Sequence, residues 1–174
     1  MENYVPDMYQ QSIYTIDYQK LLNKGIKCLL FDLDNTLAPV TDKRPTQKLK
    51  DLFEDLKSKG FKVIIFSNSP KRRIKPFKEE LNIDCCASAR KPCKEKFLLI
   101  LKEYQYTVNE VAIIGDQILT DVLGGNRVGI MTILINPISN KDFFVTKFNR
   151  YREKKIMKKL RDKNLFSKGR YYEL

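Results

Sequence analysis

The sequence contains no histidine among its 174 residues. This absence excludes Ser-His-Asp and Cys-His hydrolases, phosphatases that use a histidine nucleophile, and metal centres ligated by imidazole. Any catalysis therefore has to use carboxylates, lysine or arginine, serine or threonine, and a hard metal ion.

Long apolar runs are missing as well, since no stretch approaches the roughly 20 apolar residues that cross a bilayer. The N-terminal string MENYVPDMYQQ has neither the basic start nor the apolar stretch of a signal peptide, so we expect a cytoplasmic protein. The four cysteines are Cys28, Cys85, Cys86 and Cys93. Without histidine they are expected to be reduced thiols rather than a zinc cluster.

Acidic residues are scarce relative to basic ones, and the net charge is +12. From Lys141 onward the chain has twelve Lys or Arg against four Asp or Glu. This basic segment points to an anionic partner or surface. The length and the hydrophobic content of 43% fit one globular domain. We expect a lead-in over 1–25, a core over 26–138 and a basic helix or tail over 139–174.

Short apolar runs alternate with stretches of helical periodicity. The predicted strands are 27–34, 62–66, 83–87, 111–114 and 131–135. The predicted helices are a short one after Asp17, then 46–60, 72–81, a stretch through 97–104, and 118–128. Strands separated by helices indicate βαβ units, so the sequence predicts an α/β fold with a parallel central sheet.

The motif FDLDNTL directly follows an apolar run and contains Asp32, Asp34 and Thr36. Residues two apart on an extended chain project the same way, so the two carboxylates are expected close together. Two neighbouring carboxylates repel each other when they are buried, and a divalent metal ion relieves that repulsion. This motif is therefore the first candidate for chemistry.

Polar residues also follow the other predicted strands, where parallel sheets bind ligands. They are Ser67, Asn68, Lys91, Asp116 and Asp121. Each has an ordinary explanation as a helix cap, a turn residue or a solvated side chain. Together they favour one site, and carboxylates with a lysine and a hydroxyl suit phosphoryl transfer with Mg²⁺.

The four motifs, in this order, resemble those of the haloacid dehalogenase (HAD) superfamily of aspartate-nucleophile phosphatases. FDLDNTL matches the first motif, the IIFSN stretch the second, Lys91 the third, and GDQILTD the fourth. The resemblance implies a Rossmannoid three-layer sandwich. It also implies that Asp32 is the nucleophile and a Mg²⁺ ligand. Asp34 would be the general acid and base, with its backbone carbonyl at the metal.

The same resemblance implies roles for the remaining motif residues. Thr36 would orient the loop, while Ser67, Asn68 and Lys91 would bind the phosphate. Asp116 would complete the metal site, and Asp121 would lie behind it or bind the metal through water. The gaps between the motifs hold only one or two predicted elements each, so we expect no cap domain and an open site.

A closer resemblance, over roughly residues 5–155, is to the YqeG-type branch, which is similar to mitochondrial-type phosphatidylglycerophosphate phosphatases. It rests on LDNTLAP, FSNSPKRR, ARKP, IGDQILTDVLGGNRVG and TKFNR. It implies Mg²⁺-dependent hydrolysis of phosphatidylglycerophosphate to phosphatidylglycerol in phospholipid synthesis. Two alternatives remain at this point: a phosphatase of soluble nucleotide or sugar phosphates, and an RNA- or ribosome-associated protein.

The basic segment is predicted to be an amphipathic helix. Phe144, Phe148 and Tyr151 share one helical face, which Ile156 and Leu160 continue less regularly. Three interpretations remain open: peripheral contact with the anionic inner face of a membrane, contact with nucleic acid, and a helix packed on the core with a solvated basic face.

Overall fold

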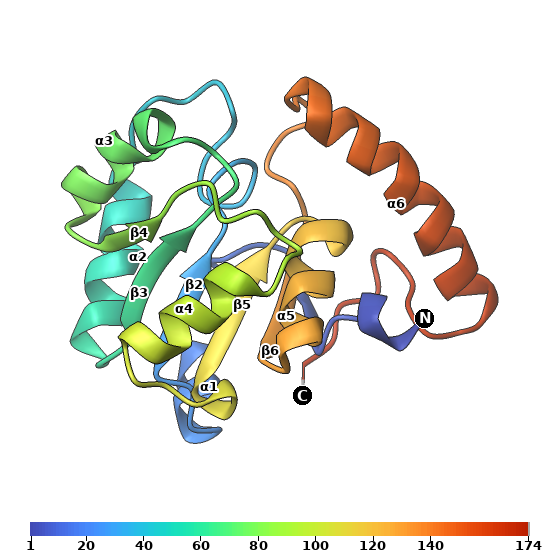
Figure 1. Cartoon of the computed structure of the whole chain (residues 1–174), viewed down its shortest axis with the longest axis horizontal. Coiled ribbons are helices and arrows are strands. Elements are labelled where there is room, and N and C mark those ends of the chain that lie inside the picture. The colour runs from blue at the N-terminus through green and yellow to red at the C-terminus, as the bar shows by residue number, and fades with distance from the viewer. Residues whose placement is uncertain (174) are drawn as a thin grey trace.

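The computed structural model describes residues 1–173, apart from the side chains of residues 144 and 145. At its centre is a six-stranded sheet in which every paired strand runs parallel to its neighbour (Figure 1). In spatial order the strands are β1 (Met8–Gln10), β6 (Met131–Ile135), β5 (Val111–Gly115), β2 (Cys28–Phe31), β3 (Lys62–Phe66) and β4 (Asp84–Cys86). The central position of β2 puts the FDLDNTL motif in the middle of one edge of the sheet.

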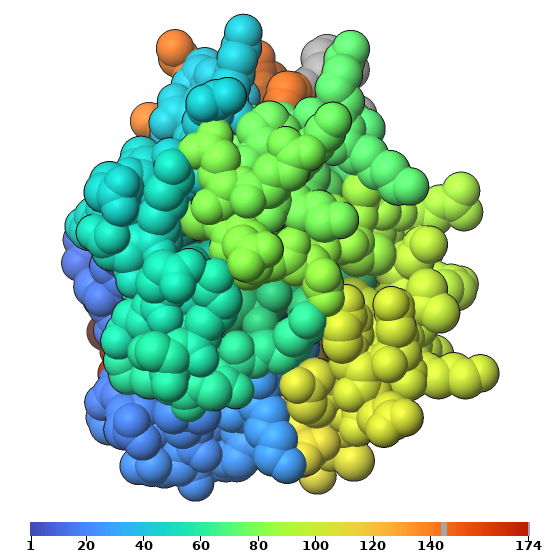
Figure 2. Space-filling model, turned by 90° about the vertical axis from the view of Figure 1, so that its left-hand side faces the viewer, coloured from blue at the N-terminus to red at the C-terminus, as the bar shows by residue number. Residues whose placement is uncertain are grey.

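Side chains alternate between the two faces of β2, as they do on any strand. Leu29 and Phe31 point into one hydrophobic cluster, and Cys28 and Leu30 point into another. The first cluster is covered by α1 (Tyr18–Asn23), α2 (Gln47–Ser58) and α3 (Lys71–Leu81), and the second by α4 (Glu95–Glu103) and α5 (Leu123–Val128). Figure 2 shows α2, α3 and α4 meeting around the β4 side of the sheet. The predicted three-layer α/β fold is confirmed.

The helix boundaries follow from local capping chemistry. The Asp17 side chain accepts a hydrogen bond from the backbone N–H of Lys20 (3.1 Å) and starts α1. Thr46 does the same for Leu49 (3.2 Å) at the start of α2. Such caps satisfy backbone donors that a helix leaves unpaired in its first turn. Shorter turns complete the chain: 3-10 turns at Glu2–Tyr4 and Val108–Glu110, and a π-helical turn at Ile118–Val122.

The sequence did not predict strand β1, which lies at the edge of the sheet beside β6. Three residues are too few to show an alternating pattern. Tyr9 forms an antiparallel bridge with Tyr172, and backbone hydrogen bonds of 3.0 and 2.9 Å join the two residues. The segments near the two chain ends therefore pack against each other at this edge.

The basic segment contains a long helix, α6 (Phe144–Asp162), which lies beyond the β6 side of the sheet (Figure 1). Its inner face is anchored by Leu160 and Glu153, both buried. Phe148 and Tyr151 are exposed, and the predicted placement of the Phe144 side chain falls outside the described residues. The helix therefore packs on the core by one face, as one of the three interpretations expected.

Neither a cap domain nor a helix that could span a membrane is found among the residues that the structure describes. No domain is inserted between the motifs of residues 1–173, so the prediction that the fold lacks a cap is confirmed. None of the helices described has the length and apolar character that a bilayer crossing requires.

Candidate active site

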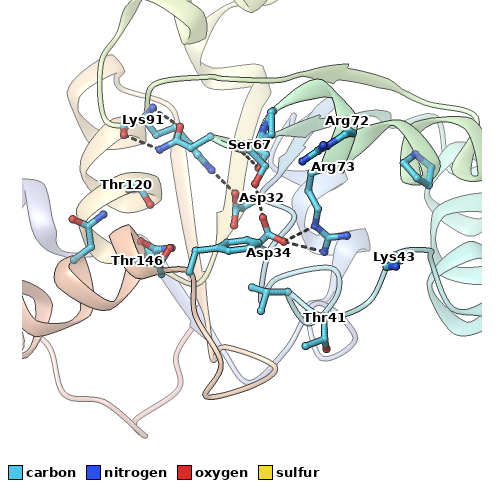
Figure 3. Close-up of a pocket in the computed structure, with 18 residues that line it drawn as sticks. Asp32, Asp34, Thr41, Lys43, Ser67, Arg72, Arg73, Lys91, Thr120 and Thr146 are labelled. Atoms are coloured by element: carbon cyan, nitrogen blue, oxygen red, sulfur yellow. Dashed lines mark hydrogen bonds and ion pairs between the residues drawn. The ribbon is translucent and has the colours of Figure 1, made fainter.

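Four of the predicted site residues, Asp32, Asp34, Ser67 and Lys91, meet beyond the carboxyl ends of the strands (Figure 3). Asp32 follows β2, and its backbone N–H donates to the carbonyl of Ile114 in β5 (2.9 Å). Ser67 follows β3 and continues the pairing with β4 through a bond to the carbonyl of Cys86 (3.1 Å). The sheet's own hydrogen bonding therefore fixes the backbone from which both side chains project.

Lys91 is buried at the centre of the site. Its Nζ lies 2.7 Å from an oxygen of Asp32, 2.7 Å from an oxygen of Asp121 and 2.9 Å from the carbonyl oxygen of Phe66. The side chain of Asn68 holds the Lys91 backbone, accepting from its N–H (2.7 Å) and donating to its carbonyl (3.1 Å). Lys91 thus has every ammonium hydrogen matched to an acceptor.

Asp121 sits in the π-helical turn that follows β5, close against Gly115. Its second carboxylate oxygen accepts from the backbone N–H of Gln117 (3.1 Å). A Cβ at Gly115 would lie 2.1 Å from that carboxylate, closer than real Cβ atoms come to other atoms. Glycine at this position therefore lets Asp121 reach Lys91.

Three buried carboxylates, those of Asp32, Asp116 and Asp121, bring oxygens within 4.8 Å of one another. Burial raises the pKa of Asp32 to about 8, with Lys91 opposing that rise and the other two carboxylates adding to it. Burial also raises the pKa of Asp116 to about 7, against the influence of Arg150. Burial alone would lower the pKa of Lys91, but Asp121 and Asp32 raise it overall.

This cluster fits a divalent cation. Lys91 and Arg150 supply two positive charges against the three carboxylates, which leaves one negative charge for a cation to balance. Buried carboxylate oxygens are the ligands that Mg²⁺ prefers. Asp32 is the clearest direct ligand, because only one of its oxygens accepts a hydrogen bond within the described residues, whereas both oxygens of Asp121 and both of Asp116 do.

Asp34 points away from that cluster, toward α3. Arg73 lies 2.9 and 3.0 Å from one of its carboxylate oxygens, and the Ser69 hydroxyl donates to the other (2.5 Å). Arg73 also donates to the carbonyls of Pro39 and Asp42 in the loop before α2. One guanidinium therefore fixes both Asp34 and the loop that borders the site.

Asp116 is held from the opposite direction by α6. Arg150 donates to the Asp116 carbonyl (2.9 Å) and pairs with its carboxylate, and Thr36 donates to the other carboxylate oxygen (3.2 Å). Glu153, one turn further along α6, pairs with Arg150 (3.3 Å) and accepts from the backbone N–H of Leu119 (2.9 Å). The final helix thus contributes to the position of a predicted metal ligand.

An open cavity of about 920 Å³ lies in front of these groups. Asp32, Asp34, Ser67 and Lys91 line its base. The walls come from the loop before α2, from α3 and from the start of α6: Val40, Thr41, Lys43, Pro70, Arg72, Arg73, Pro76, Phe143, Thr146 and Asn149. The cavity is much larger than a phosphate group, so it has room for the rest of a substrate.

The structure places all eight predicted site residues at this edge of the sheet. Ser67 and Asn68 border the cavity, but Asn68 uses its side chain to hold Lys91. Sequence reasoning missed Arg73 and Arg150, although the strings FSNSPKRR and TKFNR contain them. Each of these arginines lies within a distinctive string, which is the signal that could have found it. Only the folded structure shows that Arg73 contacts Asp34 and that Arg150 contacts Asp116.

Comparison with known proteins identifies a family of phosphatases. A family model described as "Mitochondrial PGP phosphatase" matches residues 2–139. "Probable phosphatase YqeG" of Bacillus subtilis is 40% identical over 160 residues, covering 92% of this chain and 93% of that protein. The "Phosphatidylglycerophosphate phosphatase 1, chloroplastic/mitochondrial" of Arabidopsis thaliana is 27% identical over 147 residues, covering 79% of this chain and 42% of its own length.

Solved structures support the fold. A protein from Legionella pneumophila assigned to HAD superfamily subfamily III A aligns with a TM-score of 0.53 at 21% identity, over 70% of this chain and 72% of that one. The cobalt-bound deoxy-D-mannose-octulosonate 8-phosphate phosphatase of Haemophilus influenzae aligns with a TM-score of 0.56 at 14% identity, over 82% and 95%. The structures show that the fold is HAD-like, and the sequence matches show that the chain belongs to the mitochondrial-type PGP phosphatase family.

Proposed function

We propose that this protein is a Mg²⁺-dependent phosphatase that converts phosphatidylglycerophosphate to phosphatidylglycerol through an aspartyl-phosphate intermediate. The observation that carries the proposal is the set of buried carboxylates around Lys91 at the base of a large open cavity. Membership of the PGP phosphatase family supports the choice of substrate.

Asp32 is the nucleophile in this proposal. Lys91 occupies one of its carboxylate oxygens, and the other is left to attack the phosphorus of the terminal phosphate. A bond forms between that oxygen and phosphorus while the bond from phosphorus to the leaving-group oxygen breaks. The Ser67 hydroxyl donates to one of the other phosphate oxygens, and Lys91, whose hydrogens are bonded to Asp32, Asp121 and Phe66, stabilises their charge through its own positive charge.

Asp34 is the acid and then the base. As the first bond breaks, its protonated carboxyl gives a proton to the departing glycerol oxygen. Its carboxylate then takes a proton from water, which attacks the same phosphorus and releases Asp32 and inorganic phosphate. Arg73 holds one oxygen of Asp34 during both steps, and the Ser69 hydroxyl, which donates to the other oxygen in the structure, has to release that oxygen when it carries the proton.

Asp32, Asp116 and the backbone carbonyl of Asp34 would hold the metal ion. When bound, Mg²⁺ neutralises the negative charge that these carboxylates and the phosphate bring together. Thr36 and Arg150 keep Asp116 oriented for this role.

The lipid substrate is supported by what surrounds the cavity. Val40, Pro76 and Phe143 contribute apolar surface to its walls. The outer face of α6 exposes Phe148 and Tyr151 among lysines, a combination suited to an anionic membrane surface. We therefore propose that the cytoplasmic enzyme works at the inner face of the membrane, with nucleic acid as the less favoured partner.

Phosphate release tests the proposal. Phosphatidylglycerophosphate in mixed micelles is compared with a panel of soluble nucleotide and sugar phosphates, each with Mg²⁺ and with a chelator. We expect the lipid to have the highest kcat/KM and the chelator to abolish turnover. The Asp32→Asn variant should release no phosphate. A higher kcat/KM on a soluble ester would replace the lipid substrate with a soluble one, and normal turnover by Asp32→Asn would remove the proposed nucleophile.

A further inference from the structure

Two basic side chains line the cavity without a partner of their own. Neither Arg72 nor Lys43 forms an ion pair or a side-chain hydrogen bond with the residues that the structure describes, and both are exposed. The other cations at the site are all engaged: Arg73 with Asp34, Lys91 with Asp32 and Asp121, and Arg150 with Asp116 and Glu153. Arg72 and Lys43 therefore leave positive charge available to a ligand.

Arg72 and Lys43 lie on the same side of the cavity. Figure 3 shows them on either side of Arg73, away from Thr120 and Thr146. Arg72 comes from the first turn of α3, and Lys43 from the loop before α2. Because Arg73 binds the carbonyls of that loop, it fixes the loop against α3. The two cations are thus held at one rim, where Figure 2 shows the loop and α3 side by side.

The position of this rim relative to the reacting groups limits what it can bind. In the proposed function the phosphate that is cleaved lies beside Ser67 and Lys91, at the base of the cavity. A group at Arg72 and Lys43 therefore belongs to the leaving group. Exposed cations attract anionic oxygens, and arginine suits phosphate geometry especially well. The rim also includes Val40 and Pro76, which offer an apolar surface next to the charges.

We propose that Arg72 and Lys43 form a subsite for a second, unreactive anionic group on the leaving group. In a glycerophospholipid whose terminal phosphate is cleaved, this group is the phosphodiester that joins the head group to the diacylglycerol. The inference rests on the proposed function and adds a basis for choosing among substrates. A phosphate ester without a second negative charge gains nothing from this subsite.

A pair of soluble substrates isolates the effect from membrane binding. Glycerophosphoglycerol phosphate carries both the diester and the terminal phosphate, whereas glycerol 3-phosphate carries the terminal phosphate alone. The measured quantity is the ratio of kcat/KM for the first substrate to kcat/KM for the second. We expect Arg72→Gln and Lys43→Gln each to lower this ratio about tenfold, which corresponds to the loss of one charged contact.

Lys71→Gln is the matched control. Lys71 precedes Arg72 in the same helical turn, is exposed and does not line the cavity, so the change removes the same charge from the same region. We expect the control to leave the ratio within about twofold of wild type, as long-range attraction between exposed charges is screened by salt. An unchanged ratio in Arg72→Gln and Lys43→Gln, or an equal fall in Lys71→Gln, would overturn the subsite.

A binding measurement separates this proposal from the proposed function. Both compounds are titrated calorimetrically into Asp32→Asn protein, with and without Arg72→Gln. Tighter binding of the diester compound that is lost with Arg72→Gln supports the subsite even if the lipid is not turned over. Equal binding of the two compounds by Asp32→Asn protein rejects the subsite, even when wild-type protein hydrolyses the lipid.

Discussion

The positively charged side chains on the two sides of the cavity differ in burial and in pairing. On the α6 side, the Arg150 side chain is only 20% exposed and is bonded to both Asp116 and Glu153. On the α3 side, Arg72 and Lys43 are exposed and have no partner within the described residues. Enclosed and paired cations fix the position of carboxylates, whereas exposed ones remain free to meet a ligand.

Helix α6 contributes to the site although it lies outside the part of the chain that the family model matches. The match to the family model ends at residue 139, before this helix begins. Even so, Arg150 reaches Asp116, and Phe143, Thr146 and Asn149 border the cavity. The basic helix that the sequence predicted is therefore one wall of the site as well.

The largest effect is expected where the packing around the paired charges is tightest. Gly115→Ala places a methyl group against the carboxylate of Asp121 and should break its bond to Lys91. We expect a loss of about 3 kcal/mol or more in the free energy of unfolding, measured by urea denaturation, from overpacking and an unpaired buried charge. Gly60→Ala is the comparison, because no atom lies within 4 Å there, and its φ of +92° costs alanine about 1–2 kcal/mol. Equal losses of unfolding free energy in the two variants would contradict the close contact between Gly115 and the Asp121 carboxylate.

Arg150→Gln tests the paired side directly. It leaves Asp116 and Glu153 buried without their cation, so unfolding free energy should fall by about 3 kcal/mol. Arg152→Gln, on the exposed face of the same helix, should change it by less than about 0.5 kcal/mol. Urea denaturation of both variants measures the difference, and similar values would show that α6 does not depend on the contact with Asp116.

Arg73→Lys tests whether Arg73 positions Asp34. Lysine cannot reproduce the arrangement of bonds that guanidinium makes to Asp34 and the loop. We expect kcat to fall about tenfold for glycerol 3-phosphate, whose poor leaving group needs a well-placed acid. p-Nitrophenyl phosphate has a good leaving group and should be affected less. An equal fall for both substrates would indicate a general structural role for Arg73.

The smallest effect is expected on the outer face of α6. Lys158 is exposed, so Lys158→Gln should leave stability unchanged within about 0.5 kcal/mol. Its affinity for vesicles of anionic lipid should fall about fivefold, because each lysine near such a surface contributes about 1 kcal/mol. Sedimentation with anionic and neutral vesicles measures this change. Unaltered binding to anionic vesicles would argue against membrane contact through this face.

Much of the fold could be predicted because its signals are local. The strands 62–66 and 131–135 appear in the structure with the predicted bounds, since apolar runs between helical periods identify buried parallel strands. Strand β1 could not be predicted, because its place depends on β6 and Tyr172 rather than on its own pattern.

The site residues also divide into those that the sequence could predict and those that it could not. Asp32, Ser67, Lys91 and Asp116 could be predicted because the carboxyl ends of parallel strands converge, whatever the rest of the chain does. Arg150 could not, because it lies 34 positions after Asp116 and the contact depends on how α6 packs. Long-range ion pairs leave no periodicity in a sequence.

Trapping the covalent intermediate tests the central claim most directly. Asp34→Asn protein is mixed with Mg²⁺ and p-nitrophenyl phosphate, which does not need the acid to leave, and the reaction is quenched in acid. Peptide mass spectrometry should find one phosphoryl group on the peptide that contains Asp32, and none in the Asp32→Asn, Asp34→Asn double variant. Repeated turnover of p-nitrophenyl phosphate without any phosphoryl group on Asp32 would contradict the account.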